Sequence, residues 1–220
     1  MIMFIRALDN NRADTLLQVF TQGVAESGIP LRVRTDKGME NVKIADFMLE
    51  NRGNSSMITG KSVHNQRVER MWRDVYEGSL GFYSELFSFL EDEGKLNIMN
   101  PLHIYALHYV YMQKINEKLK IWKDAWNTHR LRTVGASPLK LWTSGMINSP
   151  VPSQDTVSAD NDDMGIVSDI SRPIFGRTEV QISDTCSSAL ARECPKDWSS
   201  SNYGIELFEK AISILEVNQI

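Results

Sequence analysis

Apolar residues along the first sixty positions divide the chain into short strands and helices. Residues 1–8, MIMFIRAL, form an apolar run of strand length that ends at turn-forming residues. From Arg12 to Ser27 apolar residues recur at three- and four-residue steps, which predicts an amphipathic helix that stops at Gly28. A strand LRVRT, a helix over residues 42–48 and a second short strand, SMITG, follow. This part of the chain therefore alternates strand and helix.

From about residue 64 to residue 129 the pattern becomes almost wholly helical. The first helical segment runs to about residue 93, and Gly78 or Gly81 is expected to bend it. The stretch EDEGKLNIMNP breaks the pattern, and Asn100 and Pro101 are suited to begin the next helix. A single apolar stripe marks that second helix: His108, Met112, Ile115, Leu119, Trp122 and Trp126. A turn and a short helix over residues 138–142 complete this part.

The composition changes at about Ser144, where Ser, Asp, Asn and Pro replace large apolar residues. Such a segment cannot bury enough apolar surface to fold alone. We expect one domain over residues 1–143, an acidic, largely disordered linker over 144–202, and a helix over 203–217 that is docked or isolated. Cys186 and Cys194 fit neither a zinc site nor a disulfide framework, and both are expected to be free thiols.

The net charge of −4 is distributed unevenly along the chain. Up to Gly145 there are 19 Lys and Arg against 16 Asp and Glu, whereas the remainder has 5 against 12. The mildly basic body is compatible with a DNA surface. No apolar run approaches the ~20 residues that span a bilayer, and the start is too short to be a secretory signal. We therefore expect an intracellular protein, nuclear or cytoplasmic, without a membrane partner.

Two carboxylates stand among basic residues on separate predicted elements. Asp36 ends a strand and precedes a Lys-Gly turn, and Glu69 lies on the following helix between arginines. Carboxylates held in this way amid positive charge are what metal-dependent phosphoryl transfer requires. The alternatives are that Asp36 caps a turn and that Glu69 forms a solvated ion pair one helical turn away.

The segment from Leu31 to Val75, and above all HNQRVERMWRDV, resembles the integrase catalytic core of retroviral-type DDE integrases and transposases. The resemblance covers residues 1–142, and 32 residues separate Asp36 from Glu69, close to the spacing in that family. It implies a ribonuclease H-like α/β fold, DNA as partner, a possible homo-oligomer, and Asp36 and Glu69 as catalytic ligands of Mg²⁺ or Mn²⁺. The DNA contacts that it implies are Lys37, Lys61, His64, Asn65, Arg67, Arg70 and Arg73.

The chain departs from this family at the first catalytic Asp, which the family carries on its first strand. Asp9 and Asp14 lie in a turn and at a helix start, and neither is a good substitute. We therefore expect an N-terminally truncated core whose strand before Asp36 has an unpaired edge, descended from a DNA-integrating enzyme but without strand-transfer or nuclease activity. The alternatives are a catalytically dead nucleic-acid- or protein-binding module, and an all-helical interaction module.

Overall fold

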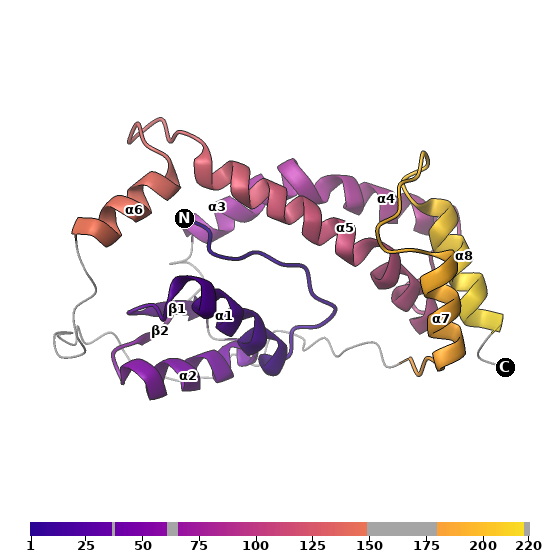
Figure 1. Cartoon of the computed structure of the whole chain (residues 1–220), viewed down its shortest axis with the longest axis horizontal. Coiled ribbons are helices and arrows are strands. Elements are labelled where there is room, and N and C mark those ends of the chain that lie inside the picture. The colour runs from indigo at the N-terminus through magenta and orange to yellow at the C-terminus, as the bar shows by residue number, and fades with distance from the viewer. Residues whose placement is uncertain (37, 61–65, 149–179, 218–220) are drawn as a thin grey trace. The chain divides into compact units, whose positions relative to one another are not determined.

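The computed structural model describes residues 1–36, 38–60, 66–148 and 180–217 (Figure 1). The chain divides into two compact units. The first unit comprises residues 1–5, 10–73 and 123–176, and the second comprises 6–9, 74–122 and 177–220. Helix α5 (Pro101–Thr128) contributes residues to both units. The described residues are mostly helical and contain one small sheet.

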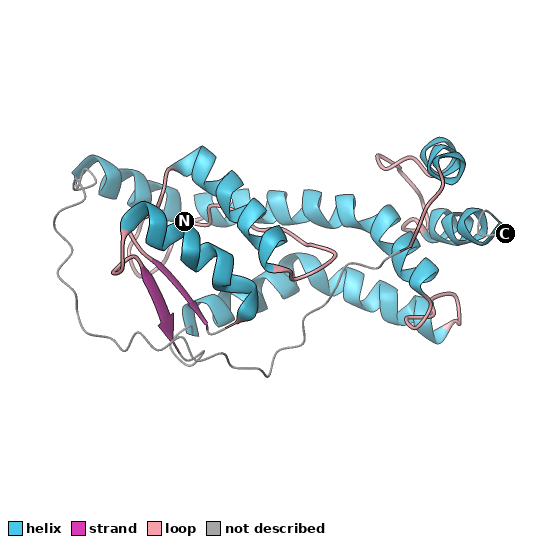
Figure 2. Cartoon of the chain, turned by 90° about the horizontal axis from the view of Figure 1, so that it is seen from below, coloured by secondary structure: helices cyan, strands magenta, loops and turns pink. Residues whose placement is uncertain are grey.

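The first unit is built around a strand–helix–strand arrangement (Figure 2). Strand β1 (Val33–Asp36) leads through the 3₁₀ turn η1 (Met39–Asn41) and helix α2 (Val42–Arg52) to strand β2 (Met57–Gly60). The two strands are parallel, and Asp36 pairs with Gly60. A crossover through a helix is the usual way to join parallel strands. The strands and the helix after residue 41 confirm the pattern predicted from the sequence.

Apolar side chains of helices α1 (Ala13–Ser27) and α2 form the core of this unit. Phe20, Ile44 and Met48 are buried, and Val33 of β1 packs against them. Gly28 ends α1 as predicted, with a φ angle of 83° that a side chain would disfavour. Helix α6 (Pro138–Asn148), also in this unit, extends the short helix expected at residues 138–142.

The N-terminal residues 1–12 are not a strand, and this corrects the strand predicted from MIMFIRAL. Their backbone instead pairs with asparagine side chains on α5. In the first unit Ile2 donates to Asn127 Oδ1 at 2.8 Å and accepts from Asn127 Nδ2 at 2.9 Å. In the second unit Ala7 makes the same pair of bonds with Asn116, at 2.9 and 3.2 Å. Each asparagine amide bonds one backbone N–H and one backbone C=O, as a neighbouring strand would.

Helices α3 (Gln66–Val75) and α4 (Gly81–Asp92) follow one another through a π-helical turn, η3 (Tyr76–Leu80). This irregular turn lies where the two glycines led us to expect a bend. A Cβ atom on Gly78 would lie 2.7 Å from Nε1 of Trp122, so only glycine permits this close approach. Asn100 caps α5 as expected, because its Oδ1 accepts from the backbone N–H of Leu102 at 3.0 Å.

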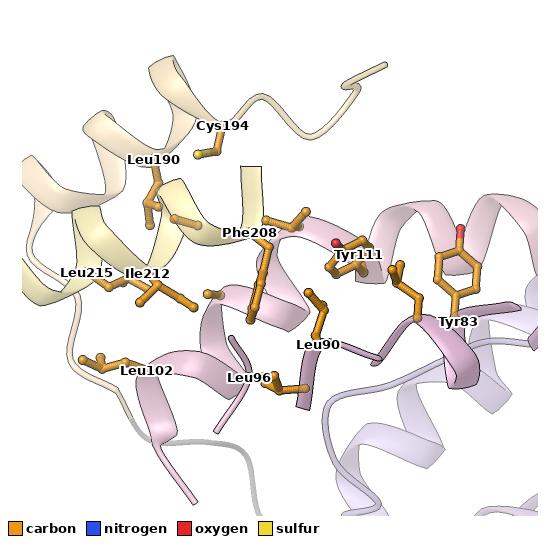
Figure 3. Close-up of a cluster of buried hydrophobic side chains, with 14 of the residues drawn as sticks. Tyr83, Leu90, Leu96, Leu102, Tyr111, Leu190, Cys194, Phe208, Ile212 and Leu215 are labelled. Atoms are coloured by element: carbon orange, nitrogen blue, oxygen red, sulfur yellow. The ribbon is translucent and has the colours of Figure 1, made fainter. Parts of the chain in front are cut away.

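The second unit has a larger core, in which α4 and α5 pack with α7 (Asp184–Glu193) and α8 (Ile205–Val217) (Figure 3). Tyr111 and Phe208 are among its fully buried side chains. On α5, Ala106, Val110 and Tyr111 are at most 2% exposed in this core, and Ile115 of the predicted stripe packs against it. Leu119 of that stripe is buried as well. The C-terminal helix is docked on this core. It begins two residues after the expected start, at Ile205, and ends at Val217 as expected.

Helix α7 was not predicted, and it lies within the range expected to be a largely disordered linker. Ser183 caps it by accepting from the backbone N–H of Cys186 at 3.2 Å. Cys186, Leu190 and Cys194 are spaced four residues apart and are all buried in the core. Both cysteines are free thiols, as the sequence predicted. Residues 149–179 of the expected linker lie outside the described residues, and the proposed domain boundaries remain predictions.

Candidate nucleic-acid interface

The carboxyl edge of the two-stranded sheet holds Asp36. Because parallel strands bring their carboxyl ends to the same edge, Asp36 lies beside Gly60, the last residue of β2. The Asp36 side chain is half-buried, and its Oδ1 accepts from Nδ2 of Asn41 at 3.1 Å. The Glu40 carboxylate folds back against Gly38 in the same turn. Asp36 is thus oriented by its own turn, as the capping alternative expects.

Arg34 is a basic residue at this edge that the sequence reasoning did not single out. It is exposed on β1, and its Nη1 lies 4.0 Å from where a Cβ atom on Gly60 would stand. The guanidinium therefore extends over the end of β2. The signal was present in the alternation of LRVRT, in which the arginines take the face opposite the apolar residues.

Helix α3 places Glu69 in its first turn, with Arg70 and Arg73 beside it. All three side chains are exposed, and within the described parts of the chain none of them forms an ion pair. The alternative in which Glu69 is paired one turn away is therefore not what the described residues show. The two arginines are three residues apart and lie on one side of the helix. Both guanidinium groups face solvent without an ion pair among the described residues.

Five of the seven expected DNA contacts fall outside the described side chains. Lys37, Lys61, His64 and Asn65 lie outside the described residues, as does the side chain of Arg67. Among the expected contacts, the structure thus places only Arg70 and Arg73, together with the two carboxylate residues, Asp36 and Glu69.

A family model described as "Integrase core domain" matches residues 1–156, which is more than two-thirds of the chain. The chain belongs to the integrase core domain family. No curated protein and no solved structure matches it. The matched region of this integrase core includes both carboxylates, helix α3 and the whole of the small sheet. The likeness first noticed in HNQRVERMWRDV is therefore confirmed at the level of the family.

Integrase cores generally use divalent metal ions. A two-metal site is surrounded by several carboxylates, because hard cations need anionic oxygen ligands. Within residues 1–36, 38–60, 66–148 and 180–217, no group of three or more His, Cys, Asp or Glu side chains could hold an ion. The described donor set does not fit a two-metal centre.

No helix in the described part of the chain combines the length and the apolar character that crossing a bilayer requires.

Proposed function

We propose that the chain is a DNA-binding integrase-core protein, descended from a metal-dependent DNA-integrating enzyme, that holds duplex DNA mainly with helix α3. The observation that carries this proposal is the pair of exposed arginines, Arg70 and Arg73, on one side of α3 without ion-pair partners among the described residues. Arg34 adds a third exposed cation within the same unit.

Arginines in this state are well suited to bind phosphate. Because no salt bridge has to be broken first, contact with DNA releases counterions without a compensating loss inside the protein. The guanidinium fork matches the phosphate oxygens and can donate two parallel hydrogen bonds. Contacts of this kind fix the position of a duplex but do not read its sequence. We therefore expect salt-dependent binding with little sequence preference.

The same proposal includes the ribonuclease H-like arrangement and the loss of chemistry. The parallel β1–α2–β2 unit followed by α3 supports such an arrangement, with Asp36 and Glu69 as the remnants of the catalytic set. Hard cations need several carboxylate ligands, and within the described residues no group of three or more His, Cys, Asp or Glu could hold such an ion. We propose that this chain binds DNA but does not cut or join it.

Binding is tested by fluorescence anisotropy with a labelled duplex. Arg70→Ala and Arg73→Ala should each weaken binding by about 1–2 kcal/mol, roughly 5–30-fold, because each removes a charged contact to phosphate. Lys118→Ala, which removes an exposed cation from α5, serves as the matched control and should bind as the wild type does. Equal losses in all three variants would show that α3 has no special role.

Turnover is tested with processed DNA ends in the presence of Mg²⁺ or Mn²⁺. The expected result is no cleavage and no strand transfer. Turnover that is present in the wild type and lost in Glu69→Gln would show that the catalytic site is complete after all.

A further inference from the structure

The second unit contains an apolar groove of about 420 Å³ between α4 and the loop that precedes α8. Leu86 is buried at its base, and Phe82, Phe89 and Tyr203 are 46%, 47% and 59% exposed at its sides. The rings of Phe82 and Tyr203 meet edge to face, with centroids 5.2 Å apart. Exposed aromatic side chains gathered around a hollow are typical of a surface that binds another protein.

This groove is already formed in the free chain. Ser200 Oγ donates to Asn202 Oδ1 at 2.6 Å and accepts from the backbone N–H of Gly204 at 3.3 Å. These bonds hold Tyr203 at a φ angle of 61°, which a non-glycine residue seldom adopts. Binding a partner would therefore cost little conformational entropy, because this side of the groove is already ordered.

The segment of chain that contributes Phe82, Glu85 and Phe89 to the groove is acidic. From Asp74 to Glu93 there are six acidic residues and no Lys or Arg. Glu85, on the rim, is exposed, and within the described part of the chain its carboxylate forms neither a hydrogen bond nor an ion pair. Charge complementarity thus calls for a basic partner that also carries apolar anchors.

Helix α3, in the first unit, has these properties. Val68 and Trp72 lie one turn apart and are 48% and 49% exposed, although both are large and apolar. Arg70 and Arg73 flank them, and neither is paired within the described residues. Anchors one turn apart on a basic helix are the usual means by which a helix binds in an apolar groove. A Trp side chain is also among the residues that contribute most to such interfaces.

We propose that the groove lined by Phe82, Phe89 and Tyr203 binds helix α3 of a second copy of this chain, with Trp72 inserted among the aromatic rings and Arg73 facing Glu85. The contact joins two different surfaces, so it either closes reciprocally between two copies or continues into larger assemblies. Both outcomes are self-association that depends on the same two surfaces.

The proposal is tested by sedimentation velocity of the full chain over a wide range of concentrations. The wild type should self-associate, and higher salt should weaken the association because opposite charges meet at the rim. Trp72→Ala and Phe89→Ala should each weaken it about tenfold or more, as expected when an aromatic anchor is lost. Ile121→Ala, which removes an apolar side chain that is 65% exposed on α5, is the matched control and should have no effect.

A charge exchange separates this contact from a general loss of folding. Glu85→Lys and Arg73→Glu should each weaken association, and the chain that carries both changes should recover it, because the pair is restored with its signs reversed. A wild-type chain that remains monomeric at every concentration would overturn the proposal. Association that is unchanged in Trp72→Ala and Phe89→Ala would overturn it equally, since it would then use another surface.

Discussion

At the scale of single residues, asparagine side chains form the backbone hydrogen bonds that the sequence pattern assigned to a neighbouring strand. The run MIMFIRAL has the composition of a strand, yet its backbone is satisfied by Asn127 and Asn116 of α5. Asn116 and Asn127 are 11 residues apart on the helix, and the backbone residues that they bond, Ala7 and Ile2, are five residues apart. Eleven helical residues and five extended residues both span about 16 Å. No local pattern reveals such pairing, because the partners are more than a hundred residues apart in sequence.

Asn127→Ala tests this arrangement. It removes both partners of the buried Ile2 backbone, and an unsatisfied buried polar group costs about 1–3 kcal/mol. The free energy of unfolding, measured with urea, should fall by about this amount, and the amide of Ile2 should exchange with deuterium faster.

Gln113→Ala is the control, because the exposed Gln113 amide bonds only to Glu117 among the contacts described, and its loss should change stability by less than about 0.5 kcal/mol. Equal stability losses in the two variants would contradict the role given to Asn127.

At the scale of elements, most helices and the two short strands followed from the sequence pattern, whereas α7 shows where periodicity fails. Helices α1, α2 and α5 carry recurrent apolar residues and were predicted close to their observed bounds. Helix α7 buries Cys186 and Leu190, and Cys194 follows directly after its end. Their four-residue spacing is missed when Cys is taken as a chemical group rather than as an apolar residue. At the site, residue types and order along the chain were predictable, but the orientation of Asp36 by Asn41 depends on the folded turn.

The turn before α8 permits a matched pair of glycine substitutions. Gly204 and Gly94 both have positive φ angles, but a Cβ atom on Gly204 would lie 2.8 Å from the Trp198 ring, whereas one on Gly94 would meet nothing within 4 Å. Gly94→Ala should therefore cost only the backbone penalty, about 1–2 kcal/mol. Gly204→Ala should cost clearly more, because steric overlap is added to that penalty.

Thermal unfolding followed by circular dichroism compares the two variants. A smaller loss of stability in Gly204→Ala than in Gly94→Ala would show that the contact with Trp198 does not constrain this turn.

At the scale of the whole molecule, each unit has its own core, and the second unit carries most of the buried ionisable groups. Burial raises the pKa of the Cys186 and Cys194 thiols and of the Tyr111 hydroxyl. Burial also lowers the pKa of His108, although the nearby charge of Asp9 opposes this shift. In each case the folded state favours the neutral form of the group, so stability depends on pH in both directions.

These shifts predict a stability maximum for the second unit near neutral to mildly alkaline pH. Above about pH 8.5, unfolded thiols lose protons that the folded chain retains, so the free energy of unfolding should fall as the pH rises. Below about pH 6.5, the unfolded state binds a proton at His108 more readily than the folded state does, so the stability should fall again. Urea unfolding across this pH range measures both limbs.

Replacement of both cysteines by alanine should flatten the alkaline limb, whatever its effect on the absolute stability. An alkaline limb of the same slope in this variant would show that the buried thiols are not its source.

The central claim is that helix α3 of this integrase-core protein binds the DNA backbone, and the salt dependence of duplex binding tests it most directly. Each phosphate contact contributes about −0.9 to the slope of the logarithm of the association constant against the logarithm of salt concentration. The double variant Arg70→Ala/Arg73→Ala should therefore have a slope that is shallower by about 2 than that of the wild type, while Lys118→Ala keeps the wild-type slope. Identical slopes in the wild type and the double variant, or no salt-dependent binding at all, would contradict the claim.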